Sequence, residues 1–336
     1  MTVIVFKQLT CLLAGSAALL LSACSPNQRG ADKAFLQTTI SADGHMIATL
    51  AHTGTDQQVL RVRSLSADAK WQTIPAPPET QSIRFGLQGH ELLLTHRKPD
   101  LPSRDYLSRL DVDKLEKGLE RIYETEDGLA FPVEVKPGQV MVRTRRPSVL
   151  SVGRGAMTGH HWILLGPGQA VQDVGPETVQ PFDAPNIVGS GFFWTEEQLD
   201  PAKEPYPLIL SFPLPGGVAP KFAREQLEKN TFTVDCDQAG KRCLRTYIAN
   251  LNQKTDAPYI SYIYDVDVLF GAKRCKLPGL SGSAGRVSLT PDGNAAVMSF
   301  ASEHDKPRHA VVLRFNPQEC EAVSVEHISL PARLND

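Results

Sequence analysis

The stretch Ser41-Ala-Asp-Gly-His-Met-Ile-Ala48 decides the fold, because it places an Asp-Gly turn directly before an apolar strand. Asp-Gly favours a tight hairpin turn, and the alternating residues of His45–His52 predict a buried strand. The same combination recurs along the chain, with turns at Gln88-Gly89, Pro137-Gly138, Pro185-Asn186, Ala239-Gly240 and Asp292-Gly293. Successive turns are 45 to 54 residues apart, and a period of this length indicates a bladed or arrayed fold.

Each repeat contains enough β-forming sequence for about four strands. In the first repeat, Leu36–Ile40 precedes the turn, and Val59–Leu65 and Trp71–Ile74 follow the first apolar strand. Such units predict an all-β protein, a β-propeller of six four-stranded blades over residues 35–333. Seven blades would need repeats of about 43 residues, which is shorter than any spacing in the chain. The segment Asp111–Tyr123 departs from the pattern, because its apolar residues have helical spacing and predict a short helix.

Two of the repeats resemble a known family. Ser41–Ala48 and Leu289–Val297 resemble the S-x-D-G-x-x-(I/V)-A signature of TolB-type propeller repeats. The other four repeats match it only in outline, so the resemblance implies the propeller fold and no particular activity. In contrast to the Tol-system protein, we expect no separate α/β domain beside this propeller.

The N-terminal residues predict where the protein is located. An apolar run follows Lys7 and ends in Leu21-Ser-Ala-Cys24, which resembles a bacterial lipobox. The resemblance implies a signal peptide over residues 1–23, cleavage before Cys24 and lipid on Cys24, with residues 24–34 as a tether. By the same resemblance, Ser25 favours the outer membrane, with the protein facing the periplasm. The alternative is a plain N-terminal membrane anchor, for which the apolar run is short.

Four cysteines remain after Cys11 leaves with the signal and Cys24 takes the lipid. An even number in an exported chain predicts two disulfides, and four cysteines allow three pairings. We expect Cys236 to pair with Cys243, because both flank the turn of the fifth repeat. We expect Cys275 to pair with Cys320, because both fall on one face of the propeller in adjacent blades.

The composition and the short motifs exclude several classes of function. The formal net charge of −2 gives no sign of a nucleic-acid-binding protein. Gly279-Leu-Ser-Gly-Ser283 lacks the second glycine of a hydrolase elbow, and Gly153–Gly159 has the wrong spacing for a dinucleotide site. His160 and His161 are neighbours on a predicted strand and point to opposite faces. These motifs therefore predict no catalytic residue, no metal ligand set and no cofactor.

One face of the propeller is predicted to carry long loops between the second and third strands of blades two to four. Arg97, Arg143, Arg145 and Arg146 lie beside these loops. Arginine suits carboxylate and phosphate partners, so we expect this face to bind an envelope protein or another anionic envelope component. Ordinary solvated surface charge is the alternative interpretation.

Two other functions remain open from the sequence. The innermost strands carry Glu134, Asp183 and Asp235 at matching positions, and converging carboxylates in the channel could serve an enzyme or a metal-dependent binder. Their alternative role is structural, because no base or nucleophile accompanies them. The third possibility is a toxin-blocking immunity lipoprotein. The favoured prediction is a membrane-anchored envelope lipoprotein that acts as a binding scaffold.

Overall fold

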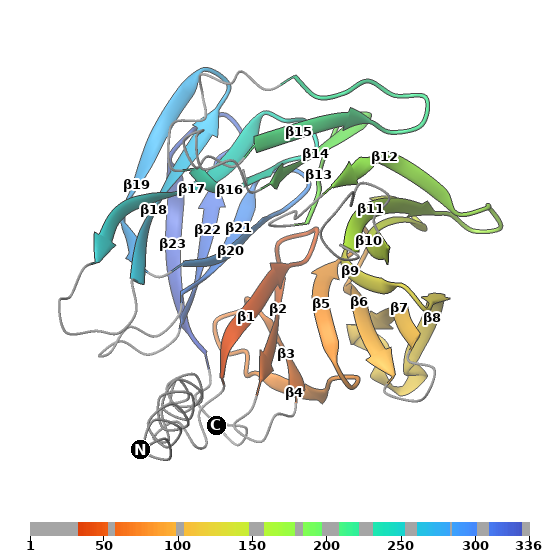
Figure 1. The fold of residues 1–336 in the computed structure, drawn as a ribbon. Helices are drawn as coiled ribbons and strands as arrows, with labels where there is room; N and C mark the ends of the chain where they lie inside the picture. Colours follow the sequence, from red (N-terminus) through yellow and green to blue (C-terminus); the bar gives the residue numbers. More distant parts are fainter. Residues whose placement is uncertain are drawn as a thin grey trace, which may run out of the picture.

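Six antiparallel sheets arranged around one axis make up the protein, as seen in the computed structural model (Figure 1). The structure describes residues 33–52, 58–98, 104–147, 158–178, 184–196, 208–221, 231–252, 261–282, 284–300 and 309–330. Each sheet is one blade of consecutive strands, and the blades follow one another around the ring in chain order. The prediction of an all-β, six-bladed propeller is therefore confirmed.

The first strand of each blade lies nearest the axis, where it contacts the first strand of a neighbouring blade. From the axis outwards, blade 1 consists of β1 (Lys33–Ile40), β2 (Met46–His52), β3 (Gln58–Ser64) and β4 (Gln72–Pro75). Blade 2 consists of β5 (Thr80–Phe85), β6 (Glu91–Lys98), β7 (Arg104–Asp111) and β8 (Leu119–Thr125). Blade 3 consists of β9 (Gly128–Lys136), β10 (Gln139–Pro147), β11 (Thr158–Leu165) and β12 (Gln172–Thr178).

The second half of the ring repeats this arrangement. Blade 4 has three strands within the described residues: β13 (Asn186–Val188), β14 (Gly191–Glu196) and β15 (Leu208–Pro213). Blade 5 consists of β16 (Thr231–Cys236), β17 (Arg242–Asn252), β18 (Ser261–Phe270) and β19 (Lys273–Gly282). Blade 6 consists of β20 (Ala284–Leu289), β21 (Ala295–Phe300), β22 (His309–Phe315) and β23 (Ala322–Ser329).

One glycine with a positive φ angle forms the turn between the first and second strands of every blade. The φ values range from +57° to +75° at Gly44, Gly89, Gly138, Gly189, Gly240 and Gly293. Glycine reaches this region without a Cβ clash, which explains why the turn residue recurs. The turn predicted at Pro185-Asn186 is wrong by a few residues. Asn186 begins β13, and the chain reverses at Gly189.

Apolar side chains fill the junctions between neighbouring blades, with one core cluster at each of the six junctions. Strand β21 is buried along its whole length and contributes side chains to two of these clusters. Ala296 and Met298 pack towards blade 5, whereas Ala295 and Val297 pack towards blade 1, because side chains alternate along a strand. Each blade therefore depends on both neighbours for its core.

The ring closes between blade 6 and blade 1 by side-chain contacts, since neither described sheet contains a strand from the other. Ile40 and Ile47 pack with Val312 and Ile328 in one cluster. The indole Nε1 of Trp71 donates to the carbonyl oxygen of Ser329 at 3.2 Å.

Two disulfides join the cysteine pairs that the sequence predicts. Cys236 and Cys243 bond across the hairpin turn of blade 5, with their Cα atoms 4.0 Å apart. Cys275 on β19 bonds to Cys320, which lies between β22 and β23 of blade 6, with a Cα separation of 6.0 Å. The first disulfide cross-links the two strands of one hairpin, and the second cross-links blades 5 and 6.

The segment Asp111–Tyr123 is helical only in its first half. A 3-10 helix, η2 (Val112–Lys117), begins after Asp111, whose carboxylate accepts a hydrogen bond from the backbone N–H of Asp113 at 3.1 Å. Gly118 then has a φ of +69° and the chain continues as β8. The predicted signal peptide, Cys24 and most of the tether lie outside the described residues, and β1 begins at Lys33. The described part contains no helix long and apolar enough to span a membrane.

Candidate functional site

Four arginines at the ends of β6 and β10 form a group that we call the arginine surface: Arg97, Arg143, Arg145 and Arg146. Gly128 on β9 marks where the two blades meet. A Cβ atom at Gly128 would lie 3.4 Å from the Cβ of Arg145 and 4.0 Å from the Nη2 of Arg97. The structure therefore brings the arginines of blades 2 and 3 close together. The connecting residues 99–103 and 148–157 lie outside the described residues.

Arg97 holds a structural position within this group. Its Nε atom donates to Oδ1 of Asp105 at 2.7 Å, and this hydrogen bond raises the pKa of Arg97 above its ordinary value. Asp105 is only 2 % exposed, and its Oδ2 accepts the backbone N–H of Leu129 from blade 3 at 2.8 Å. Asp105 thus links the two blades, and Arg97 supplies its counter-charge.

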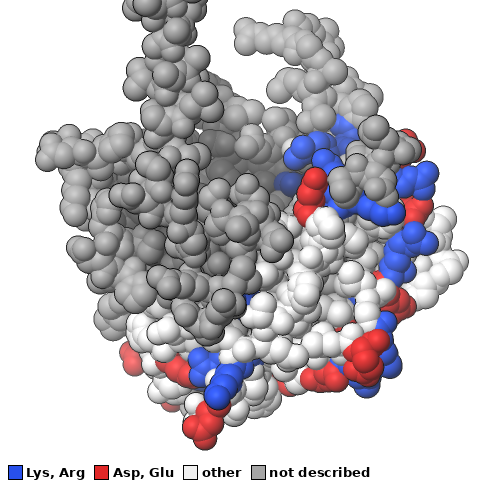
Figure 2. Space-filling model, turned by 90° about the horizontal axis from the view of Figure 1, so that it is seen from below, with Lys and Arg blue, Asp and Glu red and all other residues white. Residues whose placement is uncertain are grey.

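Arg146 is also paired with acidic residues. Its Nε lies 3.3 Å from Oδ2 of Asp127, and its Nη1 lies 3.0 Å from Oδ1 of Asp173. Figure 2 shows basic and acidic side chains side by side over the described part of one face of the molecule. Part of the expected positive charge is therefore neutralised by neighbouring carboxylates.

Arg143 and Arg145 lie on the same side of β10, because side chains alternate along a strand. The guanidinium carbon of Arg143 lies 4.3 Å from the centre of the Phe131 ring, in cation–π geometry. Arg145 is exposed, and it forms no ion pair within the described part of the chain. Arg145 is therefore the arginine whose charge is most available to a partner.

His160 lies opposite Arg145 in the β10–β11 register and is 8 % exposed. Burial lowers the pKa of His160 to about 4, and the charges of Arg143, Arg145 and His161 contribute to the lowering. His160 is consequently neutral near pH 7. The arginines thus create a positive potential that extends to this ring.

The predicted channel acids form separate links between blades. Glu134 is 4 % exposed, and its two oxygens accept the backbone N–H groups of Leu87 at 2.6 Å and Gly138 at 2.7 Å. Asp235 accepts the backbone N–H of Leu289 at 2.6 Å. Asp183 lies outside the described residues. Within the described residues, no group of three or more His, Cys, Asp or Glu side chains could hold a metal ion.

Arg84 crosses the channel, which the sequence analysis missed. It extends from β5 of blade 2, and its Nη2 lies 3.6 Å from Oδ1 of Asp235 in blade 5, on the opposite side of the ring. Two cavities on the axis share Arg84, Thr39 and Ser288 in their walls, and each has a volume of about 40 Å³. Arg84 therefore divides the described channel into two spaces that hold a few water molecules each. The sequence feature that could have predicted this contact is a basic residue in an innermost strand.

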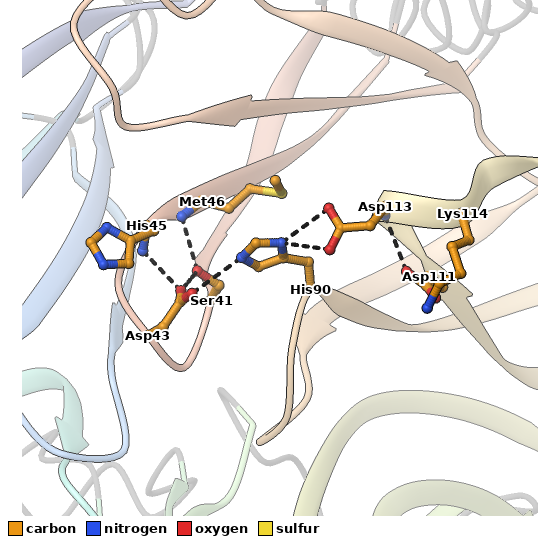
Figure 3. Close-up of polar contacts among 8 residues, drawn as sticks. All are labelled: Ser41, Asp43, His45, Met46, His90, Asp111, Asp113 and Lys114. Carbon is orange, nitrogen blue, oxygen red and sulfur yellow. Dashed lines mark hydrogen bonds and ion pairs between the residues drawn. The ribbon is translucent and has the colours of Figure 1, made fainter.

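His90 forms a second site that the sequence analysis missed (Figure 3). Its Nε2 lies 3.2 Å from Oδ2 of Asp43 in the blade 1 turn, and its Nδ1 lies 2.9 Å from Oδ2 of Asp113 in η2. Partial burial lowers the pKa of His90, but the hydrogen bonds and charges of Asp113 and Asp43 outweigh it and hold the pKa above its usual value. Since both ring nitrogens are engaged, His90 acts as a clamp between blades 1 and 2.

Comparison with known proteins identifies the fold. No protein-family model matches the chain, and no curated protein matches it. TolB from Acinetobacter baumannii has a similar structure, with a TM-score of 0.53 and 11 % identity over 86 % of this chain and 65 % of that chain. An acylaminoacyl peptidase in complex with a chloromethyl ketone gives a TM-score of 0.54 and 11 % identity, over 90 % of this chain and 47 % of that chain.

A third similar structure is the β-propeller domain of the Trilobed protease from Pyrococcus furiosus, which is described as having an open velcro topology. It gives a TM-score of 0.50 and 11 % identity over 89 % of this chain and 85 % of that chain. The chain spans about half the length of the first three matched structures, with coverage of 42 %, 53 % and 47 %. Likeness at this level of identity shows the β-propeller fold and no activity.

Proposed function

We propose that this protein is an envelope lipoprotein, anchored by lipid on Cys24, whose propeller is a scaffold that binds an anionic partner at the arginine surface. Arg145 carries the proposal, because it is exposed and forms no ion pair within the described part of the chain. Arg143 is held beside it by Phe131, and the charges of both arginines add to the effect of burial in lowering the pKa of His160. A pair of arginines on one side of a strand suits a carboxylate or phosphate group.

The channel supports a catalytic or metal-binding role less well. Both oxygens of Glu134 accept backbone hydrogen bonds, and Asp235 is shared between Leu289 and Arg84. A cavity of about 40 Å³ on either side of Arg84 is far smaller than the roughly 300 Å³ or more of a typical ligand pocket. The structural role of these acids is therefore the better supported one.

Recovery of bound material from envelope extracts tests the arginine surface. We expect the double variant R143E/R145E of the full-length protein to lose its partner, because reversal of both charges repels an anion. A matched control is K117E/K136E, which reverses two exposed lysines elsewhere and is expected to keep the partner. Recovery should also fall as salt is raised, since exposed charges are screened over about 8 Å at physiological ionic strength. Equal recovery by R143E/R145E and wild type contradicts the proposal.

The lipid anchor has its own test. Mass spectrometry of the N-terminal peptide from envelope fractions should show Cys24 as the first residue, carrying acyl chains. The variant C24S should move the protein from the membrane fraction to the soluble fraction, because stable anchoring depends on the acyl chains. An unmodified Cys24 that follows a retained residue 23 contradicts the anchor.

A further inference from the structure

A separate cavity of about 170 Å³ opens where blades 4 and 5 meet, on the face formed by the short glycine turns. Its volume is larger than that of either cavity on the axis. The apolar residues in its wall include Val188, Leu269 and Cys243 of the hairpin disulfide, and Leu269 and Cys243 are buried. The remaining wall residues are Pro220, Lys221, Ala239, Gly240, Lys241 and Gly271.

The cavity exists because glycine backbone forms part of its wall. Gly240 has a φ of +65°, and a Cβ atom there would lie 2.7 Å from Cγ1 of Val188. Gly271 has a φ of +57° and its N–H donates to the carbonyl oxygen of Lys241 at 3.0 Å. Side chains at either position would be strained, so the space stays open.

The segment after β15 forms one lip of the cavity. It folds back over the blade 4 turn, where the N–H groups of Leu214 and Val218 donate to the carbonyl and hydroxyl oxygens of Ser190, both at 3.0 Å. This brings Pro220 and Lys221 to the cavity wall. Val218, on the same segment, is 70 % exposed.

The mouth of the cavity is positively charged. Lys221 and Lys241 are both exposed and line it, and none of the lining residues is acidic. The Nζ of Lys241 lies 4.8 Å from the Phe270 ring centre and 3.3 Å from the carbonyl oxygen of Pro317, two residues next to the cavity but outside its lining. The neighbouring carboxylate of Asp237 is buried and accepts the backbone N–H groups of Lys241 and Arg242 at 2.8 and 3.0 Å.

We propose that this cavity binds an acidic peptide segment of a partner protein through one aliphatic side chain. The aliphatic side chain would pack against Val188 and Leu269 in the wall, and acidic residues on both sides of it would pair with Lys221 and Lys241. The volume suits a single side chain, and the two lysines supply the complementary charge. This site shares no residue with the arginine surface and does not depend on the function proposed for it.

Three short labelled peptides with blocked ends test the proposal on the full-length protein by fluorescence anisotropy. The first has the sequence Glu-Asp-Leu-Asp-Glu, the second replaces its leucine with serine, and the third is Lys-Arg-Leu-Arg-Lys. We expect only the first to bind well, with the serine peptide about tenfold weaker because it lacks the apolar anchor. Equal binding of the leucine and serine peptides, or no binding of the leucine peptide, overturns the proposal.

Two variants distinguish the effect of the lysine charges on peptide binding from the effect of the open cavity. K221E/K241E should weaken binding of the leucine peptide at least about tenfold, and A239F should weaken it similarly by filling the mouth without a change of charge. K117E/K136E serves as the matched control and should bind normally. R143E/R145E should also bind the peptide normally, so failure of the two proposals can be told apart. Undiminished binding of the leucine peptide by A239F overturns the proposal.

Discussion

Arg143 and Arg145 act on His160 through space, and this coupling makes the histidine a reporter of the arginine surface. The pKa of His160 is lowered to about 4 by burial and by the positive charges of Arg143, Arg145 and His161. Since the folded pKa lies below the unfolded value near 6.5, the unfolded chain takes up a proton first as pH falls. The free energy of unfolding should therefore decrease between about pH 6.5 and pH 4 because of this one residue.

Removal of the arginine charges should raise the pKa of His160. In R143M/R145M we expect an increase of about half a unit to one unit, while burial keeps the pKa below its ordinary value. NMR titration of the His160 ring signals measures this shift. The control variant R121M removes an exposed arginine of β8, which is not among the charges that lower this pKa, and should leave it unchanged. An unchanged pKa in R143M/R145M contradicts the coupling.

His90 shows the opposite pH dependence. Its folded pKa is raised by Asp113 and Asp43 in spite of partial burial, so its stabilising effect is complete below the unfolded pKa near 6.5. The effect is lost as pH rises through the raised folded pKa. We expect H90N to be less stable than the wild type by about 0.5 to 1 kcal/mol at pH 6, and by less at pH 9. Denaturant unfolding at the two pH values measures this difference in the free energy of unfolding. A difference between wild type and H90N that is larger at pH 9 than at pH 6 contradicts the clamp.

At the scale of strands, acidic side chains of the first strands act as links between blades. Glu134 on β9 accepts hydrogen bonds from Leu87 of blade 2 and from Gly138 in its own turn. Gly86 lies so close that a Cβ atom there would be 2.8 Å from Oε2 of Glu134. The carboxylate is thus enclosed by backbone on two sides.

Loss of the Glu134 carboxylate should destabilise the propeller. We expect E134A to lower the free energy of unfolding by about 2 to 3 kcal/mol, because two backbone N–H groups lose their acceptors. E134Q keeps one acceptor oxygen and should lower the free energy of unfolding by less. K136A, on the same strand but exposed, is the matched control and should change stability little. Denaturant unfolding decides this, and equal stability of E134A and K136A contradicts the structural role.

Local signals in the sequence predict the strands and turns well, but they do not predict partners between strands. The X-Gly turns can be predicted because each turn needs a residue with a positive φ angle. The turn of blade 4 was predicted three residues too early, because Pro185-Asn186 is itself a sequence that favours turns. The acid partners of the arginine surface could not be foreseen. Asp105 is 8 residues from Arg97, and Asp173 is 27 residues from Arg146 on another strand.

The same limit applies to the sites in and around the channel. The repeat alone places Glu134 and Asp235 on first strands, but the backbone N–H groups that bind them across the blade junctions belong to neighbouring blades, 47 and 54 residues away. His90 meets Asp43 and Asp113 over separations of 47 and 23 residues. The length of the repeat can be found in a single sequence. The side-chain pairs between blades cannot, because they depend on how neighbouring blades are oriented relative to each other.

For the molecule as a whole, the ring is held by junctions between blades rather than by exchange of a strand within the described residues. The junction of blades 5 and 6 has an additional covalent link, the Cys275–Cys320 disulfide, which closes a loop of 45 residues. The Cys236–Cys243 disulfide closes a loop of only 7 residues inside blade 5. The two bonds should therefore contribute differently to the stability of the ring.

The longer loop should give the larger stabilisation, because a cross-link removes more conformational freedom from the unfolded chain when it joins distant residues. By the chain-entropy relation, the loss of Cys275–Cys320 costs about 4 kcal/mol and the loss of Cys236–Cys243 about 2.4 kcal/mol. Guanidinium unfolding of C275A/C320A and C236A/C243A, each compared with the wild type, measures both values. A larger loss in C236A/C243A would contradict this order and would show that the hairpin of blade 5, rather than the junction of blades 5 and 6, limits the stability of the propeller.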